Sequence, residues 1–170
     1  MKKVLFSLGL IVSTAFALNI GEVPNSVTID AKNGGKISGG AWDSSMLKDK
    51  IHVVFYVDPD EKDKNEKFAD ALKAEKFDHS KYGTVAIVNL AATWKPDVII
   101  EALLKSKQKK FPSATYVKDK KKVLVKEWGL ADDNSDIMVF GKDGKLLYLK
   151  EGKLDKQEIE KVIEIIRSKI

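Results

Sequence analysis

The stretch that decides the fold begins at residue 51 and reads Ile51-His52-Val53-Val54-Phe55-Tyr56-Val57-Asp58-Pro59-Asp60. Its first seven residues are nearly all apolar and rich in β-branched side chains. This composition is typical of a strand that is covered on both faces at the centre of an α/β sheet. Asp58-Pro59-Asp60 ends the strand. Residues 63–77 follow with apolar side chains on one side and charged ones opposite, which predicts a helix.

A second strand and a second helix follow this pair. Residues 84–90 predict another buried strand. Pro96 suits the first turn of a helix, and that helix is expected to run to about Gln108. Its apolar residues, Val98, Ile99, Ala102 and Leu103, repeat at helical spacing. The order strand, helix, strand, helix predicts a parallel core with right-handed crossovers.

The carboxyl-terminal part predicts shorter strands and a closing helix. Residues 114–117 and 123–125 are short strand candidates. Lys142-Asp143-Gly144 lies between two apolar runs, residues 137–140 and 145–149, and predicts a hairpin. Asp155 precedes Glu158 by three residues, which predicts a capping box at the start of the last helix.

A second hairpin is predicted near the amino terminus. Asn33-Gly34-Gly35 separates the short apolar runs 27–29 and 36–38. A tight turn between two strands needs positive φ, which Asn and Gly adopt easily. We therefore expect residues 27–29 to pair with residues 36–38.

The first residues have the layout of a secretory signal. Two lysines are followed by a run up to Gly21 that has no charged side chain, and Ala15-Phe16-Ala17 supplies the small residues that signal peptidase needs. A membrane span needs about 20 apolar residues, and this run is shorter. We expect residues 1–17 to be a signal peptide cleaved after Ala17. Residues 18–170 would then be one domain in the periplasm, with no stable membrane anchor after cleavage.

The composition excludes several chemistries. The chain has no cysteine, so it has no thiol for disulfide exchange, for cysteine protease activity or for a zinc–thiolate site. Arg167 is the only arginine among 30 basic residues. Planar recognition of phosphate and guanine favours arginine, and we therefore expect no nucleic-acid partner.

Four distinctive strings carry a resemblance to a known family. They are Val54–Asn65, Ala86–Asn89 with Thr93–Pro96, Lys105–Pro112 and Lys126–Asp133. Through them the chain resembles the YtfJ family of small periplasmic proteins. More broadly, the order of its elements is similar to that of a thioredoxin-like domain. The resemblance implies an α/β fold with a central mixed sheet flanked by helices and an amino-terminal β-hairpin extension.

The resemblance also locates the missing redox site. The redox pair of thioredoxins follows the first long strand, and matching strand ends places Asp60 and Asp63 near its two positions. The slot of the cis-proline that faces the pair holds Ser135 or a close neighbour. A carboxylate cannot attack a disulfide, so disulfide oxidoreductase and peroxidase activities are excluded.

Polar side chains gather at the predicted carboxyl edge of the sheet, where open α/β sheets bind ligands. The candidate binding residues are Asp58, Asp60, Asp63, Asn65, Asn89, Trp94, Lys95 and Ser135. The oxygens of residues 58–65 are of the kind that Ca²⁺ prefers, but the EF-hand spacing is absent. Turn and helix-capping roles explain the same side chains and are the favoured interpretation. A groove lined by Trp94, Lys95 and the Asp60 loop is the alternative.

The leading hypothesis is a non-catalytic binding or adaptor protein of the periplasm, whose partner is an unidentified exported protein or small ligand. It assigns no catalytic residue, no metal and no cofactor, and it leaves the oligomeric state open. The alternative hypothesis is an enzyme of non-thiol chemistry that uses the acidic loop Asp58–Asn65, with or without a metal. The lysines of residues 105–110 and 118–122 form either a solvated face or a patch that attracts anionic lipid or an acidic partner.

Overall fold

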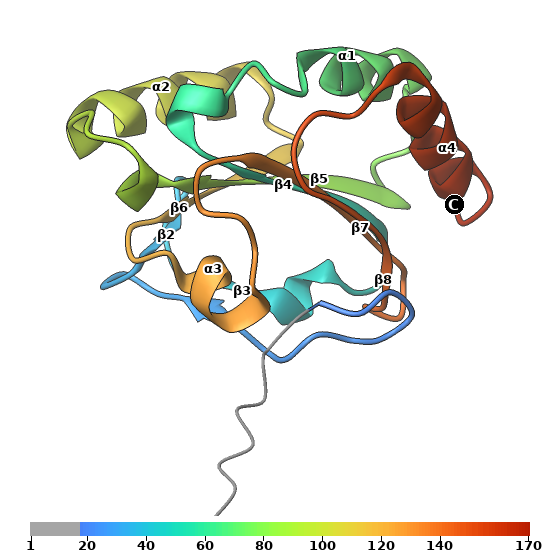
Figure 1. The fold of residues 1–170 in the computed structure, drawn as a ribbon, viewed down its shortest axis with the longest axis horizontal. Helices are drawn as coiled ribbons and strands as arrows, with labels where there is room; N and C mark the ends of the chain where they lie inside the picture. The colour runs from blue at the N-terminus through green and yellow to red at the C-terminus, as the bar shows by residue number, and fades with distance from the viewer. Residues whose placement is uncertain (1–17) are drawn as a thin grey trace, which may run out of the picture.

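The computed structural model describes residues 18–170 (Figure 1), so the predicted signal peptide, residues 1–17, lies outside the described residues. The strand predicted at the centre is β4 (Ile51–Val57). It lies inside a six-stranded sheet of order β2-β6-β5-β4-β7-β8, and its backbone is hydrogen-bonded on both sides, to β5 and to β7. Both faces of this sheet are covered by other elements (Figure 1).

The sheet is mixed, as predicted. The parallel strands are β4, β5 (Tyr82–Asn89) and β6 (Ala114–Asp119). Three further strands run antiparallel to their neighbours: β7 (Ser135–Phe140), β8 (Leu146–Lys150) and the short edge strand β2 (Gly34–Lys36). The predicted parallel core and the predicted hairpin of β7 and β8 are confirmed.

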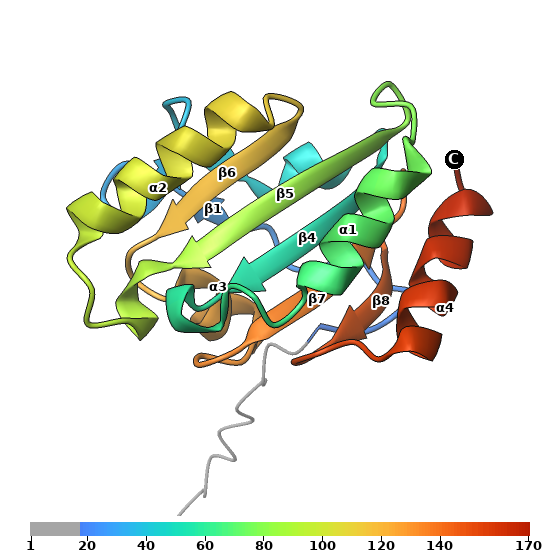
Figure 2. The ribbon, with the colours of Figure 1, turned by 90° about the horizontal axis from the view of Figure 1, so that it is seen from above.

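Helices cover both faces of the sheet (Figure 1). One face carries α1 (Glu66–Glu75), α2 (Asp97–Lys110) and α4 (Lys156–Arg167). Seen from above, α2 lies along β6, α1 lies over the middle of the sheet and α4 lies beside β8 (Figure 2). The other face carries α3 (Val123–Trp128), the strands β1 (Thr28–Ile29) and β3 (Trp42–Asp43), and the short 3₁₀ helix η1 (Ser44–Leu47). Two further 3₁₀ turns, η2 (Pro59–Glu61) and η3 (Leu90–Ala92), follow β4 and β5.

The predicted cap of the last helix is confirmed. The Asp155 carboxylate accepts a hydrogen bond of 2.8 Å from the Glu158 N–H, and the Glu158 carboxylate accepts one of 2.9 Å from the Asp155 N–H. The apolar stripe of α4 then buries Val162, Ile163 and Ile166 against the sheet. No helix within residues 18–170 is both long enough and apolar enough to cross a bilayer.

The predicted strand at residues 123–125 is wrong, because these residues begin α3. Asp119, at the end of β6, accepts hydrogen bonds from the N–H groups of Lys121 (3.1 Å) and Leu124 (3.2 Å). A side-chain oxygen that binds the free N–H groups of a first turn stabilises a helix start. The helix ends where Gly129 adopts a φ of 69°.

The predicted pairing of residues 27–29 with residues 36–38 is also wrong. β1 pairs with β3, and β2 instead joins the main sheet beside β6. Gly34 has a φ of +135°, and a Cβ at this position would lie 1.9 Å from the carbonyl oxygen of Lys118. This glycine therefore permits a close approach of two backbones, which cannot be distinguished in the sequence from a turn glycine.

The apolar repeat of α2 lies mostly on its outer side. The large side chains that α2 buries are Ile100 and Leu104, whereas Val98 is 72% exposed and both Ile99 and Leu103 are 53% exposed. The sequence pattern therefore identified the helix correctly but drew attention to its solvent side.

Replacing Gly34 with alanine tests the close approach of β2 and β6. Gly34→Ala should lower the free energy of unfolding by about 2–4 kcal/mol, because it adds both an unfavourable φ and a clash with backbone. Gly39→Ala is the matched control: Gly39 has a φ of +103°, but no described atom would lie within 4 Å of a Cβ placed there, so a loss of about 1 kcal/mol is expected. Urea denaturation measures both, and equal losses would contradict the interpretation.

Candidate functional site at the carboxyl edge of the sheet

Most of the buried polar side chains lie at one edge of the sheet. Within residues 18–170, seven polar or charged residues are buried, and only His52 lies away from this edge. The other six are Asp58, Asn65, Asn89, Asp119, Ser135 and Asp136. They meet because β4, β5 and β6 end here in parallel while β7 begins here.

The acidic loop after β4 is held by its own backbone and by the loop after β5. The Asp58 carboxylate accepts a hydrogen bond of 2.8 Å from the Asp60 N–H and caps η2. The Asp60 carboxylate accepts a bond of 2.7 Å from the Thr93 hydroxyl and forms an ion pair with Lys95. These bonds, first of all the one from Lys95, lower the pKa of Asp60. The structure thus brings Asp60 and Lys95 together.

Asp63 does not join this group, because its exposed carboxylate pairs with the neighbouring Lys62. Within residues 18–170, nowhere do three or more histidine, aspartate or glutamate side chains converge so as to hold a metal ion. Asp58, Asp60, Asp63 and Asn65 therefore bind separate partners.

Asn65 connects the start of α1 to two distant segments. Its side-chain N–H groups donate to the Ser135 carbonyl and hydroxyl, both at 3.1 Å, and to the Gly152 carbonyl at 3.0 Å. Its oxygen accepts a bond of 2.9 Å from the Leu154 N–H. Asn65 and Ser135, both predicted as site residues, are in direct contact, and their polar groups bind each other and the backbone.

Asn89 binds a residue that the sequence did not single out. Its side-chain N–H groups donate to the Asp132 carbonyl (3.1 Å) and carboxylate (2.9 Å), and Asp132 also pairs with Lys122. Burial raises the pKa of Asp132, but the bonds from Lys122 and Asn89 outweigh burial and the net pKa is lowered. This carboxylate is therefore ionised at neutral pH.

Two further buried acids were missed by the sequence analysis. Asp119 accepts a hydrogen bond of 3.1 Å from the Tyr56 hydroxyl in addition to its bonds to α3. Asp136 accepts one of 2.9 Å from the Ala131 N–H. The signal in the sequence was the position of each acid: Asp119 ends β6, and Asp136 is the second residue of β7. Lysines around Asp119 made that region look like a solvated loop.

The environment of Asp136 makes it the acid with the largest change in pKa at this edge. Burial raises its pKa to about 6, and burial also raises the pKa of Asp58. Within residues 18–170, one oxygen of Asp136 and the side-chain oxygen of Asn89 are buried without a hydrogen-bond partner. Among the described residues, no hydroxyl at the edge forms a nucleophile–base pair with an imidazole, and each buried carboxylate accepts a bond from the protein itself.

A pH titration of stability tests the state of Asp136. The folded chain holds this proton more tightly than the unfolded chain, whose aspartate pKa is about 4. Asp136 therefore stabilises the fold fully below about pH 4, and this contribution is lost as the pH rises through about 6.

Asp136→Asn keeps an oxygen for the Ala131 N–H but cannot ionise. Relative to this variant, the wild type should gain about 2–3 kcal/mol of stability between pH 7 and pH 4 in urea denaturation. Asp70→Asn, at an exposed position of α1, is the control for the removal of a carboxylate. A constant difference between wild type and Asp136→Asn across this range would contradict the prediction.

Comparison with known proteins agrees with the resemblance seen in the sequence. Residues 20–169 match the family described as "Bacterial protein of unknown function (YtfJ_HI0045)". The chain is 28% identical to the protein YtfJ of Escherichia coli over 129 residues, which cover 74% of this chain and 70% of that protein. It is 31% identical over 128 residues to a protein of Haemophilus influenzae, with the same coverage of 74% and 70%.

Solved structures confirm the fold. The exposed lipoprotein thioredoxin Etrx1 of Streptococcus pneumoniae superimposes with a TM-score of 0.57 at 16% identity, covering 78% of this chain and 97% of that one. At this identity the likeness concerns the fold alone. The chain is a cysteine-free protein with a thioredoxin-like fold, and it belongs to the YtfJ family.

Proposed function

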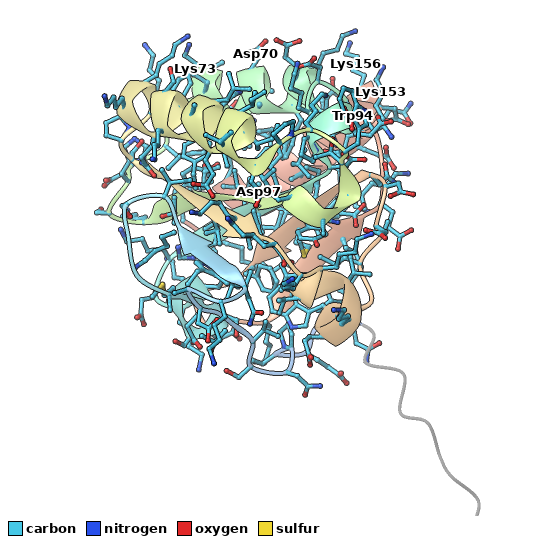
Figure 3. All side chains as sticks on the ribbon, turned by 90° about the vertical axis from the view of Figure 1, so that its left-hand side faces the viewer. Asp70, Lys73, Trp94, Asp97, Lys153 and Lys156 are labelled. Carbon is cyan, nitrogen blue, oxygen red and sulfur yellow. The ribbon has the colours of Figure 1, made fainter. Side chains whose placement is uncertain are left out.

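We propose that this chain is a non-catalytic binding module of the periplasm, which docks an acidic, partly apolar segment of another exported protein. The observation that carries the proposal is Trp94, whose side chain is 86% exposed. Figure 3 views the molecule from the side of α2 and shows Trp94 at the surface. Its neighbours Thr93 and Lys95 are bound to Asp60, so the loop is held in place while the indole remains uncovered.

Trp94 lies three residues before α2, and together with the exposed apolar side chains of that helix it forms one set along the chain. We call it the Trp94–α2 surface, and its large apolar members are Trp94, Val98, Ile99 and Leu103. Single exposed apolar residues are common, whereas contiguous ones mark interaction sites, and Ile99 and Leu103 are neighbours on the helix surface because they are four residues apart. Tryptophan in particular is enriched among the residues that contribute most to protein–protein affinity.

The charges around this surface favour an acidic partner. Asp97 and Glu101 turn towards the sheet, where they pair with Lys118 of β6 and with Lys120 just after it. The second half of α2 carries Lys105, Lys107, Lys109 and Lys110, and none of the ion pairs within residues 18–170 involves them. The outward face therefore presents positive charge beside apolar side chains.

The order of apolar and lysine side chains along α2 favours a protein segment over a membrane surface as the partner. A helix that lies in a lipid interface carries apolar side chains along its whole length, with lysines on the opposite flank. In α2 the apolar residues occupy the first half and the lysines the second. A bound segment with apolar residues followed by acids would match this order.

The absence of a thiol supports a binding role over the activities of thioredoxins, since the chain has no cysteine. The Trp94 loop is held in place by the exposed Asp60 carboxylate, which binds Thr93 and Lys95. In this proposal the edge that carries redox chemistry in thioredoxins is a support for a docking surface.

Cross-linking in periplasmic extract tests the docking surface. Trp94→Ala and Leu103→Ser should each reduce capture of the partner about tenfold or more, because each removes a large apolar contact. Ile20→Ser, which alters an exposed apolar residue elsewhere, should leave capture unchanged. Cross-links should map to an acidic segment of the partner, and equal capture by the wild type and all three variants would overturn the proposal.

A charge-reversal pair tests the partner's acidity. Lys109→Glu with Lys110→Glu should weaken the complex and reduce its dependence on salt, since two attractive charges become repulsive. Lys48→Glu with Lys142→Glu is the matched control, at exposed positions that the backbone bond from Asp49 to Lys142 brings near each other on another part of the surface. Sedimentation with anionic vesicles that depends on Trp94 would instead indicate a membrane partner.

Export is tested separately by the mass of the protein in the periplasmic fraction. Cleavage after Ala17 predicts a chain that begins at Leu18 and lacks both lysines of the amino-terminal segment. Recovery of the chain in the cytoplasmic fraction with residues 1–17 intact would contradict this part of the proposal.

A further inference from the structure

We propose that a pocket at the opposite, amino-terminal edge of the sheet binds a small organic carboxylate with an apolar body. The pocket has a volume of about 290 Å³ and lies where β4, β5 and β6 begin, under the segment that leads from β2 to η1. This volume lies just below the range of about 300–1,000 Å³ that small-molecule sites occupy. The proposal is independent of the Trp94–α2 surface.

Strand pairing explains why these side chains meet. Lys36 of β2 lies opposite Val117 of β6, and Val85 of β5 lies opposite Thr115. Side chains opposite each other, or two residues apart on one strand, share a face of the sheet. Lys36, Val85 and Thr115 therefore lie on the face that α3 covers. The close approach at Gly34 places Lys36 there.

Of the ten residues that line the pocket, five have apolar and five have polar side chains. Met46 supplies apolar surface on the side of η1, with the buried Trp42 behind the wall, and Ser38 and Thr115 supply hydroxyl groups. Small-molecule sites commonly combine a mainly apolar lining with a few polar groups that fix orientation. The pocket therefore suits a flat or branched apolar body.

The charge of the pocket favours an anion. Among the described residues that line it, Lys36 is the only charged side chain at neutral pH, because none is an acid and burial lowers the pKa of His52. None of the ion pairs within residues 18–170 involves Lys36. A single ammonium group is a point charge that suits a carboxylate, whereas bidentate recognition of phosphate favours arginine.

Two buried nitrogens beside the pocket lack partners. Within residues 18–170, four buried side-chain polar atoms have no hydrogen-bond partner, and two of them are Trp42 Nε1 and His52 Nδ1. Both residues line the pocket. The Trp42 indole N–H is a donor, and an unsatisfied buried donor costs about 1–3 kcal/mol, so an acceptor atom brought to it by a ligand would relieve that cost. Solvent does not reach these nitrogens, and a ligand would engage them after a small shift of the wall.

Nuclear magnetic resonance tests the pocket directly. Indole-3-acetate is titrated into ¹⁵N-labelled protein, and the assigned N–H signals of the three indole side chains are followed. The Trp42 signal should shift and saturate with a dissociation constant near or below about 1 mM, while the signal of the exposed Trp94 stays in place. Indole-3-acetamide, which has the same shape without the charge, should bind about tenfold or more weakly.

Substitution of the lysine completes the test. Lys36→Met keeps the apolar stem and removes the charge, so it should weaken indole-3-acetate about tenfold without changing the affinity for the amide. Lys32→Met, at an exposed position on the loop before β2, is the control and should bind as the wild type does. A Trp42 signal that does not move would overturn the proposal. So would equal affinities of the acid and the amide for Lys32→Met as well as for Lys36→Met.

Discussion

The hydrogen bonds of Asn65 hold the edge of the sheet on which the rest of the molecule depends. This one side chain binds Ser135 at the start of β7 and both Gly152 and Leu154 before α4, so it joins the start of α1 to two segments far along the chain. Its donors and its acceptor are all engaged, and leaving any partner unpaired in this buried place would cost about 1–3 kcal/mol. The oxygen that a cation would need is already bound to a backbone N–H. The edge is therefore closed by the protein itself.

The parts of the fold that the sequence predicted are those with a local cause. The buried strand β4, the hairpin of β7 and β8, and the capping box at Asp155 and Glu158 each depend on neighbouring residues. The parts that it did not predict depend on contacts from afar. α3 is too short for a helical period to emerge, and its first turn is bound by the carboxylate of Asp119 in the preceding strand. β2 pairs with β6, from which it is separated along the chain by two other strands of the same sheet and by two helices.

The same distinction applies to the candidate site. The contact between Asp60 and Lys95 could be expected, because both loops follow adjacent parallel strands and meet at one edge. The roles of Asp119 and Asp136 could not, because their burial is set by α3 and by the loop before β7. Asp119 and Asp136 stabilise this edge through hydrogen bonds from backbone N–H groups. Their carboxylates contact the backbone and not solvent. The side chain of Trp94, by contrast, is exposed.

The orientation of α2 shows that charge can decide which of two apolar faces is buried. Ile100 and Leu104 on one side, and Val98, Ile99 and Leu103 on the other, are similar in hydrophobicity, so apolar periodicity alone cannot choose between them. Asp97 and Glu101 are one helical turn apart and lie on the side of Ile100 and Leu104. Lys118 and Lys120, at the end of β6 and just beyond it, reach towards them. Turning the helix over would separate these acids from their lysines and would bring Lys109 and Lys110 towards the basic strand. These ion pairs therefore favour the orientation that leaves Val98, Ile99 and Leu103 on the surface. The charged residues that form them can be read from the sequence.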